Sequence, residues 1–314
     1  MQALARTADI FVENYRPGVM ETLGLDYASL SAINPRLIYA SISGYGQTGP
    51  DRNKGGFDLV AQGVSGIMSV TGEPGGAPVK SGIPLTDLGA GLFATVGILA
   101  ALESRHRTGR GQHVDTSLLD AGVGLSVWEA TQYFSGRGIP ERLGLGASHE
   151  RAVPGVQVRG RLHHDWRRQR PDVPSHLRRA QPSGMARRCP SSRRTGCASA
   201  TARTSPRAIE AMTAAQPRAH WLELFEANSI PCGPINDYSQ VFQDPQVIAR
   251  ELVVDVQHPT LGAIKALGSP IKLSATPADR QTARTAARRA HWRGSIADRD
   301  RGSGIGDQKA IAAV

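Results

Sequence analysis

Two short stretches of the chain share one design, in which an apolar run ends in a turn rich in glycine or proline. In "ADIFVENYRPG" the apolar residues 10–12 precede Pro17 and Gly18, and in "RLIYASISGYGQTGP" residues 37–42 precede several glycines and Pro50. Short apolar runs that end in such turns predict buried strands followed by loops. Because open α/β sheets bind ligands at the carboxyl ends of their strands, we predict an α/β fold with a site near these two loops.

The next part of the chain predicts two helices and the position of one carboxylate. Residues 57–70 contain small side chains at helical positions, which would let another backbone approach closely. After a loop rich in proline and glycine, the apolar pattern from residue 88 to about residue 106 predicts a second helix, buried on more than one face. Basic residues in its last turn and Gly109 beyond them predict where it stops. Asp87 is therefore expected at or beside the N-cap of this helix.

Residue type alone gives Asp87 two interpretations. Aspartate is among the best N-cap residues, since its carboxylate accepts hydrogen bonds from free backbone N–H groups and is stabilised by the helix dipole. A catalytic role is favoured by Gly89 and Gly91, which leave the first turn without side chains, so that another group could approach closely. Glycine inside a helix costs up to about 1 kcal/mol relative to alanine, so two of them there need a reason. Residue type favours capping, and the neighbouring glycines keep catalysis open.

The formal charge of +10 comes from one window rather than from the whole chain. Residues 156–207 hold 13 Arg, no Lys and two acidic residues, and the rest of the chain is about neutral. One interpretation is an arginine-rich arm that binds nucleic acid, but Trp166 is its one aromatic residue, which leaves little for base stacking. The apolar residues of the window follow no helical or strand period, which favours a solvated, disordered insert. A shifted reading frame in a GC-rich gene would leave the same composition.

Other features narrow the class of protein. Three cysteines in 314 residues form no disulfide framework, and the chain opens with no leader pattern, so we expect a soluble cytoplasmic protein without membrane contact. His106 and His113 have no carboxylate or thiol at metal-ligand spacing, which predicts no metal site and gives both residues solvent or capping roles. Cys232 lacks a paired base and is interpreted as structural. Tyr45, Gln47 and Thr48, in the second glycine loop, are candidates for substrate contact.

Several blocks in order along the chain resemble the family III CoA-transferases of the CaiB/BaiF type, which include formyl-CoA transferase, carnitine CoA-transferase and α-methylacyl-CoA racemase. The resemblance runs from residue 9 to about residue 154 and resumes over residues 220–277. It is carried by "VENYRPGVMETLGL", "SISGYGQTGP", "GGFDLVAQGVSGIMSVTG", "GIPLTDLGAGLFATVGILAAL", "RHRTGRGQHVDTSLLDA" and "HWLELFEANSIPCGPINDYSQVFQDPQVIARELVVDVQHPTLGAIKALGSPIKLSATP".

The resemblance implies an activity and a nucleophile. The aspartate that attacks the thioester in these transferases falls on Asp87, which would form a mixed anhydride with the acyl group and then an aspartyl-CoA thioester. The implied partners are an acyl-CoA and a carboxylic acid acceptor, so coenzyme A is a substrate and no cofactor is permanently bound. Backbone N–H groups at the start of the helix could stabilise the nucleophile and the developing oxyanion.

The resemblance also assigns weaker positions. Asn14 and Tyr15 fall on positions that contact coenzyme A, and Phe57 falls on an aromatic position near the nucleotide and pantetheine. The racemase carries a histidine at the place of Phe57 that exchanges protons, and because phenylalanine cannot do so, transfer is favoured over a racemase-like isomerase. Gly144 and Gly146 align loosely with a loop that closes over the nucleophile, although both also fit ordinary flexible turns.

The implied architecture is a truncated Rossmann-like large domain over residues 1–151, followed by a small α+β domain over residues 152–277 in which 156–207 is aberrant and disordered. Residues 278–314 form an altered tail. Members of the family begin with a strand, a turn and a helix that this sequence lacks, and they form interlocked homodimers. These departures keep a second interpretation open, in which the chain is an inactive remnant of such an enzyme.

Overall fold

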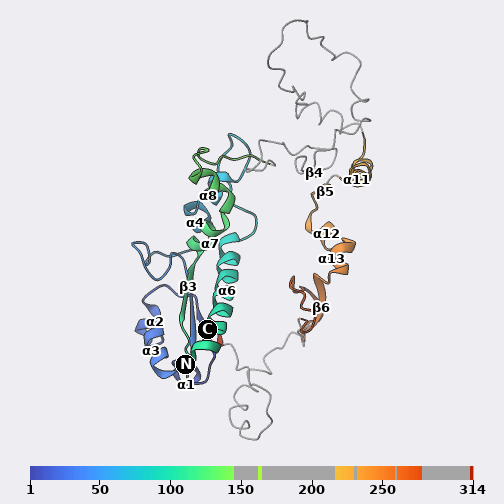
Figure 1. Ribbon diagram of the computed structural model, residues 1–314. Coiled ribbons are helices and arrows are strands. Elements are labelled where there is room, and N and C mark those ends of the chain that lie inside the picture. The colour runs from blue at the N-terminus through green and yellow to red at the C-terminus, as the bar shows by residue number, and fades with distance from the viewer. Residues whose placement is uncertain (145–161, 165–215, 230–231, 259, 278–311, 314) are drawn as a thin grey trace. The chain divides into compact units, whose positions relative to one another are not determined.

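The computed structural model describes residues 1–144, 162–164, 216–229, 232–258, 260–277 and 312–313 (Figure 1). The chain divides into two compact units, Met1–Cys232 with Asp307–Val314, and Gly233–Gly306. The predicted boundary at residue 151 lies outside the described residues. So do the window 156–207, apart from the short strand β4 (Leu162–His164), and the tail 278–314, apart from β8 (Ala312–Ala313). The expectations for these segments stay predictions.

A parallel sheet of four strands forms the centre of the first unit, in the order β3-β2-β1-β8. The strands β1 (Ile10–Glu13) and β2 (Ile38–Ser43) follow the two apolar runs, and β3 (His113–Ser117) extends the sheet beyond β2. Ile10 pairs with Ile38 and Tyr39 pairs with His113, while Phe11 also pairs with Ala312 of β8. The predicted α/β fold is confirmed, because parallel strands joined by helical crossovers form this sheet.

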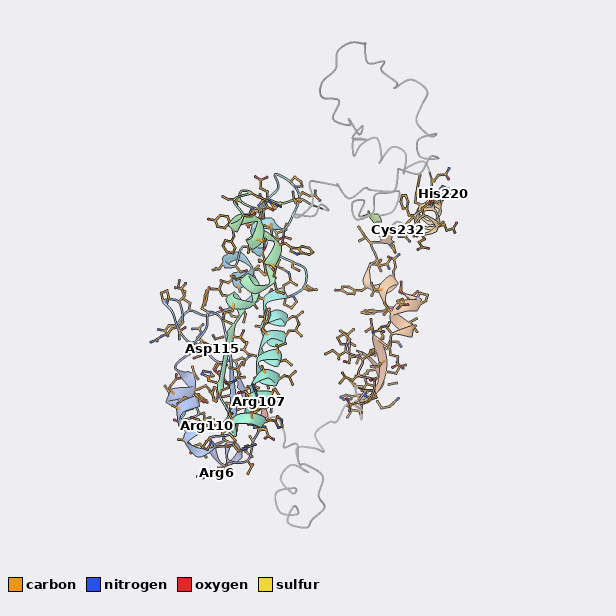
Figure 2. All side chains as sticks on the ribbon, viewed as in Figure 1. Arg6, Arg107, Arg110, Asp115, His220 and Cys232 are labelled. Atoms are coloured by element: carbon orange, nitrogen blue, oxygen red, sulfur yellow. The ribbon has the colours of Figure 1, made fainter. Side chains whose placement is uncertain are left out.

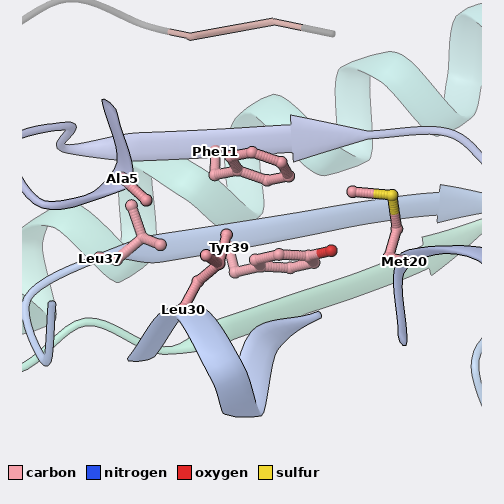
Figure 3. Packing of buried hydrophobic residues seen from close by; sticks show 6 residues of the cluster. All are labelled: Ala5, Phe11, Met20, Leu30, Leu37 and Tyr39. Atoms are coloured by element: carbon pink, nitrogen blue, oxygen red, sulfur yellow. The ribbon is translucent and has the colours of Figure 1, made fainter. Parts of the chain in front are cut away.

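Successive residues of each strand point to opposite faces, and helices cover both faces. On one face α1 (Gln2–Ala5), α2 (Val19–Thr22) and α3 (Tyr27–Ile33) pack against Phe11 and Tyr39, whose rings stack with centroids 5.1 Å apart (Figure 3). On the other face α6 (Leu85–Thr108) contributes Ala101 to a cluster with Ile10 and Ile38. The alternation of the strands therefore sorts the core into two layers.

Residues 57–70 form two short helices rather than the single predicted helix. These are α4 (Asp58–Val64) and α5 (Ile67–Val70). Gly66 between them has a φ of 90°, a left-handed conformation that glycine adopts without strain and that ends a right-handed helix. The turn allows α7 (Leu118–Leu125) to approach, since a Cβ on its Gly122 would lie 2.5 Å from the Cβ of Ser65. The helix α8 (Val127–Phe134) follows α7.

The long helix α6 begins at Leu85, three residues before the predicted start, and ends at Thr108, with Gly109 beyond it as expected in a left-handed conformation with φ 73°. Pro84 is the N-cap residue and Asp87 is the third residue of the first turn, so the prediction that Asp87 lies at or beside the N-cap is wrong. By length and composition, with a mean hydropathy of 1.8 over 18 residues, α6 could cross a membrane, which the sequence analysis did not expect. Core helices of soluble proteins pass the same test but are mostly buried, whereas 28% of this window is buried, with Ile98, Ala101 and Leu102 packed against the sheet.

The remaining described elements follow the window. The helix α11 (Arg218–Ala227) packs Trp221 and Phe225 with the half-buried Cys232. Cys232, labelled in Figure 2, begins β5 (Cys232–Pro234). Burial, together with Glu226, raises the pKa of the Cys232 thiol, which keeps it protonated as a structural thiol would be. The second unit contains α12 (Tyr238–Val241), α13 (Pro245–Ala249) and an antiparallel hairpin of β6 (Val253–His258) and β7 (Gly262–Leu267).

Candidate active site

Asp87 lies beyond the carboxyl ends of the strands. At the other end of α6, the Arg105 guanidinium donates to the carbonyl oxygens of Asp9 and Arg36, which precede β1 and β2. Since α6 packs along the sheet from that end, its first turn reaches the opposite edge. The Asp87 side chain is exposed there. Open α/β sheets bind ligands at this edge, so the predicted position of the site stays a prediction that this geometry allows.

The start of α6 is capped by a carboxylate from another helix. Asp58, the first residue of α4, accepts hydrogen bonds from the Thr86 backbone N–H at 3.0 Å and from the Thr86 hydroxyl at 2.8 Å. Asp58 therefore performs the capping that the sequence analysis gave to Asp87. The Thr86 N–H group is already bonded, so it does not supply an oxyanion donor of the kind expected from the first turn.

Gln62, one helical turn after Asp58, extends this arrangement. Its side-chain amide donates to the second Asp58 oxygen at 2.7 Å, and its carbonyl oxygen accepts from the Ser81 backbone N–H at 2.8 Å. Gln62 and Thr86 are fully buried. Buried hydrogen-bonded side chains lose their rotamer freedom, so this network fixes the loop from Ser81 to Asp87 against α4. The backbone that carries the Asp87 carboxylate is consequently held in place.

The two carboxylates have opposite pKa shifts. Partial burial raises the pKa of Asp58, but hydrogen bonds from Thr86 and Gln62 outweigh this, so that its pKa lies below the ordinary value of 3.8. The pKa of Asp87 is raised above 3.8, first by desolvation of its carboxyl group and then by the negative charge of Asp58. Asp87 is still ionised at neutral pH, and a higher pKa makes it a more basic carboxylate.

Close backbone contacts bring the other predicted residues towards this edge. A Cβ on Gly44, directly after β2, would lie 2.6 Å from the Cα of Gly56, and a Cβ on Gly55 would lie 2.5 Å from Nη2 of Arg16. The loop before α4 thus lies between the end of β2 and the segment after β1. Because a side chain on Gly44 would collide with the Gly56 backbone, glycine is required there, whereas at Gly55 the flexible end of Arg16 can move aside.

The structure places the sequence-predicted residues as follows. Asn14 and Tyr15 follow β1 directly, and the Tyr15 backbone N–H donates to Glu13 at 2.8 Å. Phe57, the residue before Asp58, has 72% of its surface exposed. Gly144 has a φ of 59° and donates its N–H to Gly72 O at 2.9 Å, whereas Gly146 lies outside the described residues. Their roles towards coenzyme A stay predictions.

The glycines of α6 differ in what they allow. A Cβ on Gly89 would lie 3.0 Å from Leu125 Cδ1 and 3.3 Å from Ala121 Cβ, so the group that approaches Gly89 is α7. Gly91 faces open space, because no described atom lies within 4 Å of the position that a Cβ would take there. Packing against α7 therefore explains the glycine at position 89, whereas no packing contact explains the glycine at position 91.

Residues of the second glycine loop contact β3. The Gln47 backbone N–H donates to Asp115 Oδ2 at 3.1 Å; Asp115 is labelled in Figure 2. The role expected for His113 is wrong, because it is a half-buried residue of β3, with Nε2 2.9 Å from Ser41 Oγ and its ring stacked on Tyr27. His106 is exposed in the last turn of α6, where a basic residue favours the helix dipole.

Sequence reasoning missed Asp58, Gln62 and Thr86. The spacing of Asp58 and Gln62 by four residues on a helix was a usable signal, since it puts both side chains on one face. Their joint target, the loop before Asp87, could not be read from the sequence because it lies about 20 to 30 residues away. Among the described residues, no group of three His, Cys, Asp or Glu side chains could hold a metal ion.

Comparisons with known proteins agree with this architecture. The sequence profile of CoA-transferase family III matches residues 1–286. The chain is 36% identical to a mouse succinyl-CoA:glutarate CoA-transferase, covering 87% of this chain and 63% of the relative. It is 34% identical to the succinate–glutarate CoA-transferase of Agrobacterium fabrum, covering 88% of this chain and 69% of the relative. The chain thus spans somewhat less than two thirds of the mouse protein.

The fold matches a solved structure. A CaiB/BaiF family protein from Brucella suis superposes with a TM-score of 0.75 at 30% sequence identity, over 94% of this chain and 77% of that protein. The similarity therefore extends over most of the chain in structure as well as in sequence.

Proposed function

Because the chain belongs to CoA-transferase family III, we propose that it transfers coenzyme A from an acyl-CoA thioester to a carboxylic acid. The observation that carries the proposal is the exposed Asp87 carboxylate, held on a fixed first turn at the ligand-binding edge of the sheet. Coenzyme A is a substrate in this proposal and not a resident cofactor.

In the proposed mechanism the Asp87 carboxylate attacks the thioester carbonyl carbon, a C–O bond forms, the C–S bond breaks, and coenzyme A leaves as a thiolate. The thiolate then attacks the aspartyl carbonyl of the anhydride, which releases the donor acid and leaves an aspartyl-CoA thioester. The acceptor carboxylate repeats both steps in reverse order and restores Asp87. No electrons are gained or lost overall. Asp58 is a positioning residue in this scheme, since it bonds the backbone that carries Asp87.

The relatives suggest the class of acid. The mouse and Agrobacterium relatives are named for succinate and glutarate, and another relative, from Acetobacter aceti, is an acetyl-CoA:oxalate CoA-transferase. We therefore propose dicarboxylic acids as substrates, with succinyl-CoA and glutarate as the first pair to assay. Phe57 supports transfer over racemisation, because its ring cannot exchange a proton.

The proposal is tested by incubating the purified chain with succinyl-CoA and glutarate and measuring glutaryl-CoA by mass spectrometry. Asp87→Asn should abolish the product. Asp120→Asn is a matched control, because Asp120 is also an exposed aspartate in the first turn of a helix, α7, and should keep the activity. Hydroxylamine added with succinyl-CoA should convert Asp87 to a hydroxamate. A folded chain that gives neither product nor hydroxamate would be an inactive remnant, and exchange of the α-proton of a 2-methylacyl-CoA without transfer would indicate an isomerase.

A homodimer is part of the proposal. One strip of α6 exposes apolar side chains at helical spacing, a pattern that is uncommon on a monomer surface. Light scattering after size exclusion should give a molar mass of two chains. Leu92→Glu, in the middle of the strip, should reduce the measured mass to that of one chain. The strip consists of Leu88, Leu92, Val96 and Leu99.

A further inference from the structure

A cavity of about 250 Å³ lies on the sheet face opposite α6, between the strands and the α2–α3 segment. It is separate in the fold from the Asp87 network, which none of its lining residues joins. The volume is below the ~300–1,000 Å³ that is typical for drug-sized ligands, so an occupant would be small. The side chains that the argument uses are Glu13, Arg16, Tyr39, Ser41 and His113.

Glu13 brings a nearly buried carboxylate to this cavity. Its side chain at the end of β1 is 4% exposed, and its one hydrogen bond within the described residues is from the Tyr15 backbone N–H to Oε2. Arg16 also lines the cavity but makes no ion pair with Glu13, and its guanidinium lies against Gly55. A buried carboxylate is costly unless a cation or several hydrogen-bond donors compensate it. Oε1 accepts no hydrogen bond from the described residues, so it is available for a donor.

Tyr39 adds a second polar group that faces the cavity. The residue is 2% exposed, and its hydroxyl has no hydrogen-bond partner among residues that the structure describes. In Figure 3 this hydroxyl points along the strand towards Met20, which also lines the cavity. The hydroxyl oxygen is not among the enclosed polar atoms without partners, so it opens into the cavity, where water or a ligand can bind it.

The charge of the lining is negative. Three carboxylates, Glu13, Glu21 and Asp26, stand against the one guanidinium of Arg16. Asp26 uses both of its oxygens on Ser29, which leaves Glu13 as the buried acceptor. Desolvation lowers the pKa of His113, although Asp115 and Glu13 oppose the shift, and desolvation with the nearby carboxylates raises the pKa of Tyr39. Both side chains are therefore uncharged at neutral pH, and neither neutralises Glu13.

We propose that this cavity binds a small organic cation with a primary ammonium group, which donates to Glu13 and is surrounded by the rings of Tyr27 and Tyr39. An ammonium carries three donors and matches a carboxylate and a hydroxyl together, and aromatic rings attract cations through their π faces. The rings are already ordered, because Tyr27 stacks on His113 with centroids 5.2 Å apart and Ser41 holds the imidazole. None of the residues that line this site takes part in the Asp87 network.

The test measures binding to the full chain by isothermal titration calorimetry with ethanolamine, which is a cation at pH 7.5, and with ethylene glycol as the neutral molecule of the same size. Ethanolamine should bind and ethylene glycol should not. Glu13→Gln should weaken ethanolamine at least about tenfold, because it removes the buried charge while keeping the shape. Tyr39→Phe should weaken it by a smaller factor. Glu103→Gln removes an exposed carboxylate from α6 and should leave binding unchanged.

Several results would overturn the proposal. These are equal binding of the two molecules, unchanged binding in Glu13→Gln, or no ethanolamine binding to the unaltered chain. Circular dichroism shows whether each variant is folded. If Glu13→Gln does not fold, the proposal is still tested in two ways. These are the comparison of ethanolamine with ethylene glycol on the unaltered chain, and ethanolamine binding to Tyr39→Phe.

Discussion

Asp58→Asn is the substitution that most directly tests how Asp87 is held. The carboxylate of Asp58 accepts three hydrogen bonds, from the Thr86 N–H, the Thr86 hydroxyl and the Gln62 amide. An asparagine keeps one oxygen for Thr86 but turns an NH₂ group towards the NH₂ of Gln62. Gln62 cannot rotate to relieve this without losing the bond from Ser81 N–H to its oxygen. The variant should therefore weaken the first turn of α6 while leaving its sequence unchanged.

The size of the effect follows from the bonds lost. A hydrogen bond to a charged group contributes about 1.5–3 kcal/mol and a neutral one about 0.5–1.5 kcal/mol, so each weakened bond costs roughly 1 kcal/mol. Asp58 is half-buried, which reduces the total through solvent screening. We expect opening of the first turn to become easier by about 2 kcal/mol, which corresponds to exchange about 30 times faster at the amides of Thr86 and Asp87.

Hydrogen exchange followed by mass spectrometry on peptides that cover residues 81–92 measures this opening. Asp51→Asn is the control, because Asp51 also accepts from a neighbouring side chain, Lys54 at 2.8 Å, but the side chains of that pair are 62% (Lys54) and 42% (Asp51) exposed. An exposed pair contributes at most about 1 kcal/mol, and this one lies outside the network. Equal exchange in Asp58→Asn, the control and the unaltered protein would refute the idea that Asp58 caps α6.

Three further predictions follow from the described contacts. Arg105 is buried and ion-paired with Asp9 at 3.0 Å, so Arg105→Leu should lower the free energy of unfolding in urea by about 3 kcal/mol. Arg107, labelled in Figure 2, is exposed in the same turn, so Arg107→Leu should change that free energy little. Gly122→Ala should destabilise by about 1–3 kcal/mol because the methyl group meets Ser65, while Gly91→Ala, which faces open space, should stabilise α6 by up to about 1 kcal/mol, both by urea unfolding. In initial-rate assays of CoA exchange across pH, activity should rise as Asp87 ionises, with a midpoint above pH 3.8. Asp58→Asn should move that midpoint to lower pH, because it removes the negative charge beside Asp87. A midpoint that stays fixed would contradict the electrostatic coupling of the two carboxylates.

The low pKa of Asp58 also sets a pH range for its contribution. Because the folded-state pKa lies below the unfolded value of 3.8, its stabilisation is fully present above pH 3.8 and is lost as pH falls through the folded-state pKa. The difference in urea midpoint between the unaltered protein and Asp58→Asn should therefore be largest near neutral pH and shrink below pH 3.8.

Local patterns in the sequence determined β1, β2 and the C-terminal end of α6. The apolar runs that became β1 and β2 are buried whatever the partner strand, and Gly109 ends α6 because glycine adopts the left-handed conformation freely. The family resemblance also predicted the α/β fold and the membership of CoA-transferase family III, and both are confirmed. These are properties of single segments or of their order along the chain.

Only the tertiary structure decided which carboxylate caps α6 and which is left exposed. Asp58 and Asp87 are the same residue type, each in the first turn of a helix, and local propensity cannot distinguish them. The distinction depends on α4 and α6 lying together, so that Asp58 reaches Thr86 across 28 residues. The cavity around Glu13 has the same origin, because Glu13, Tyr39 and His113 come from three strands whose register sets them on one face. Contacts between distant segments form only when the chain is packed, and no periodicity within a segment encodes them.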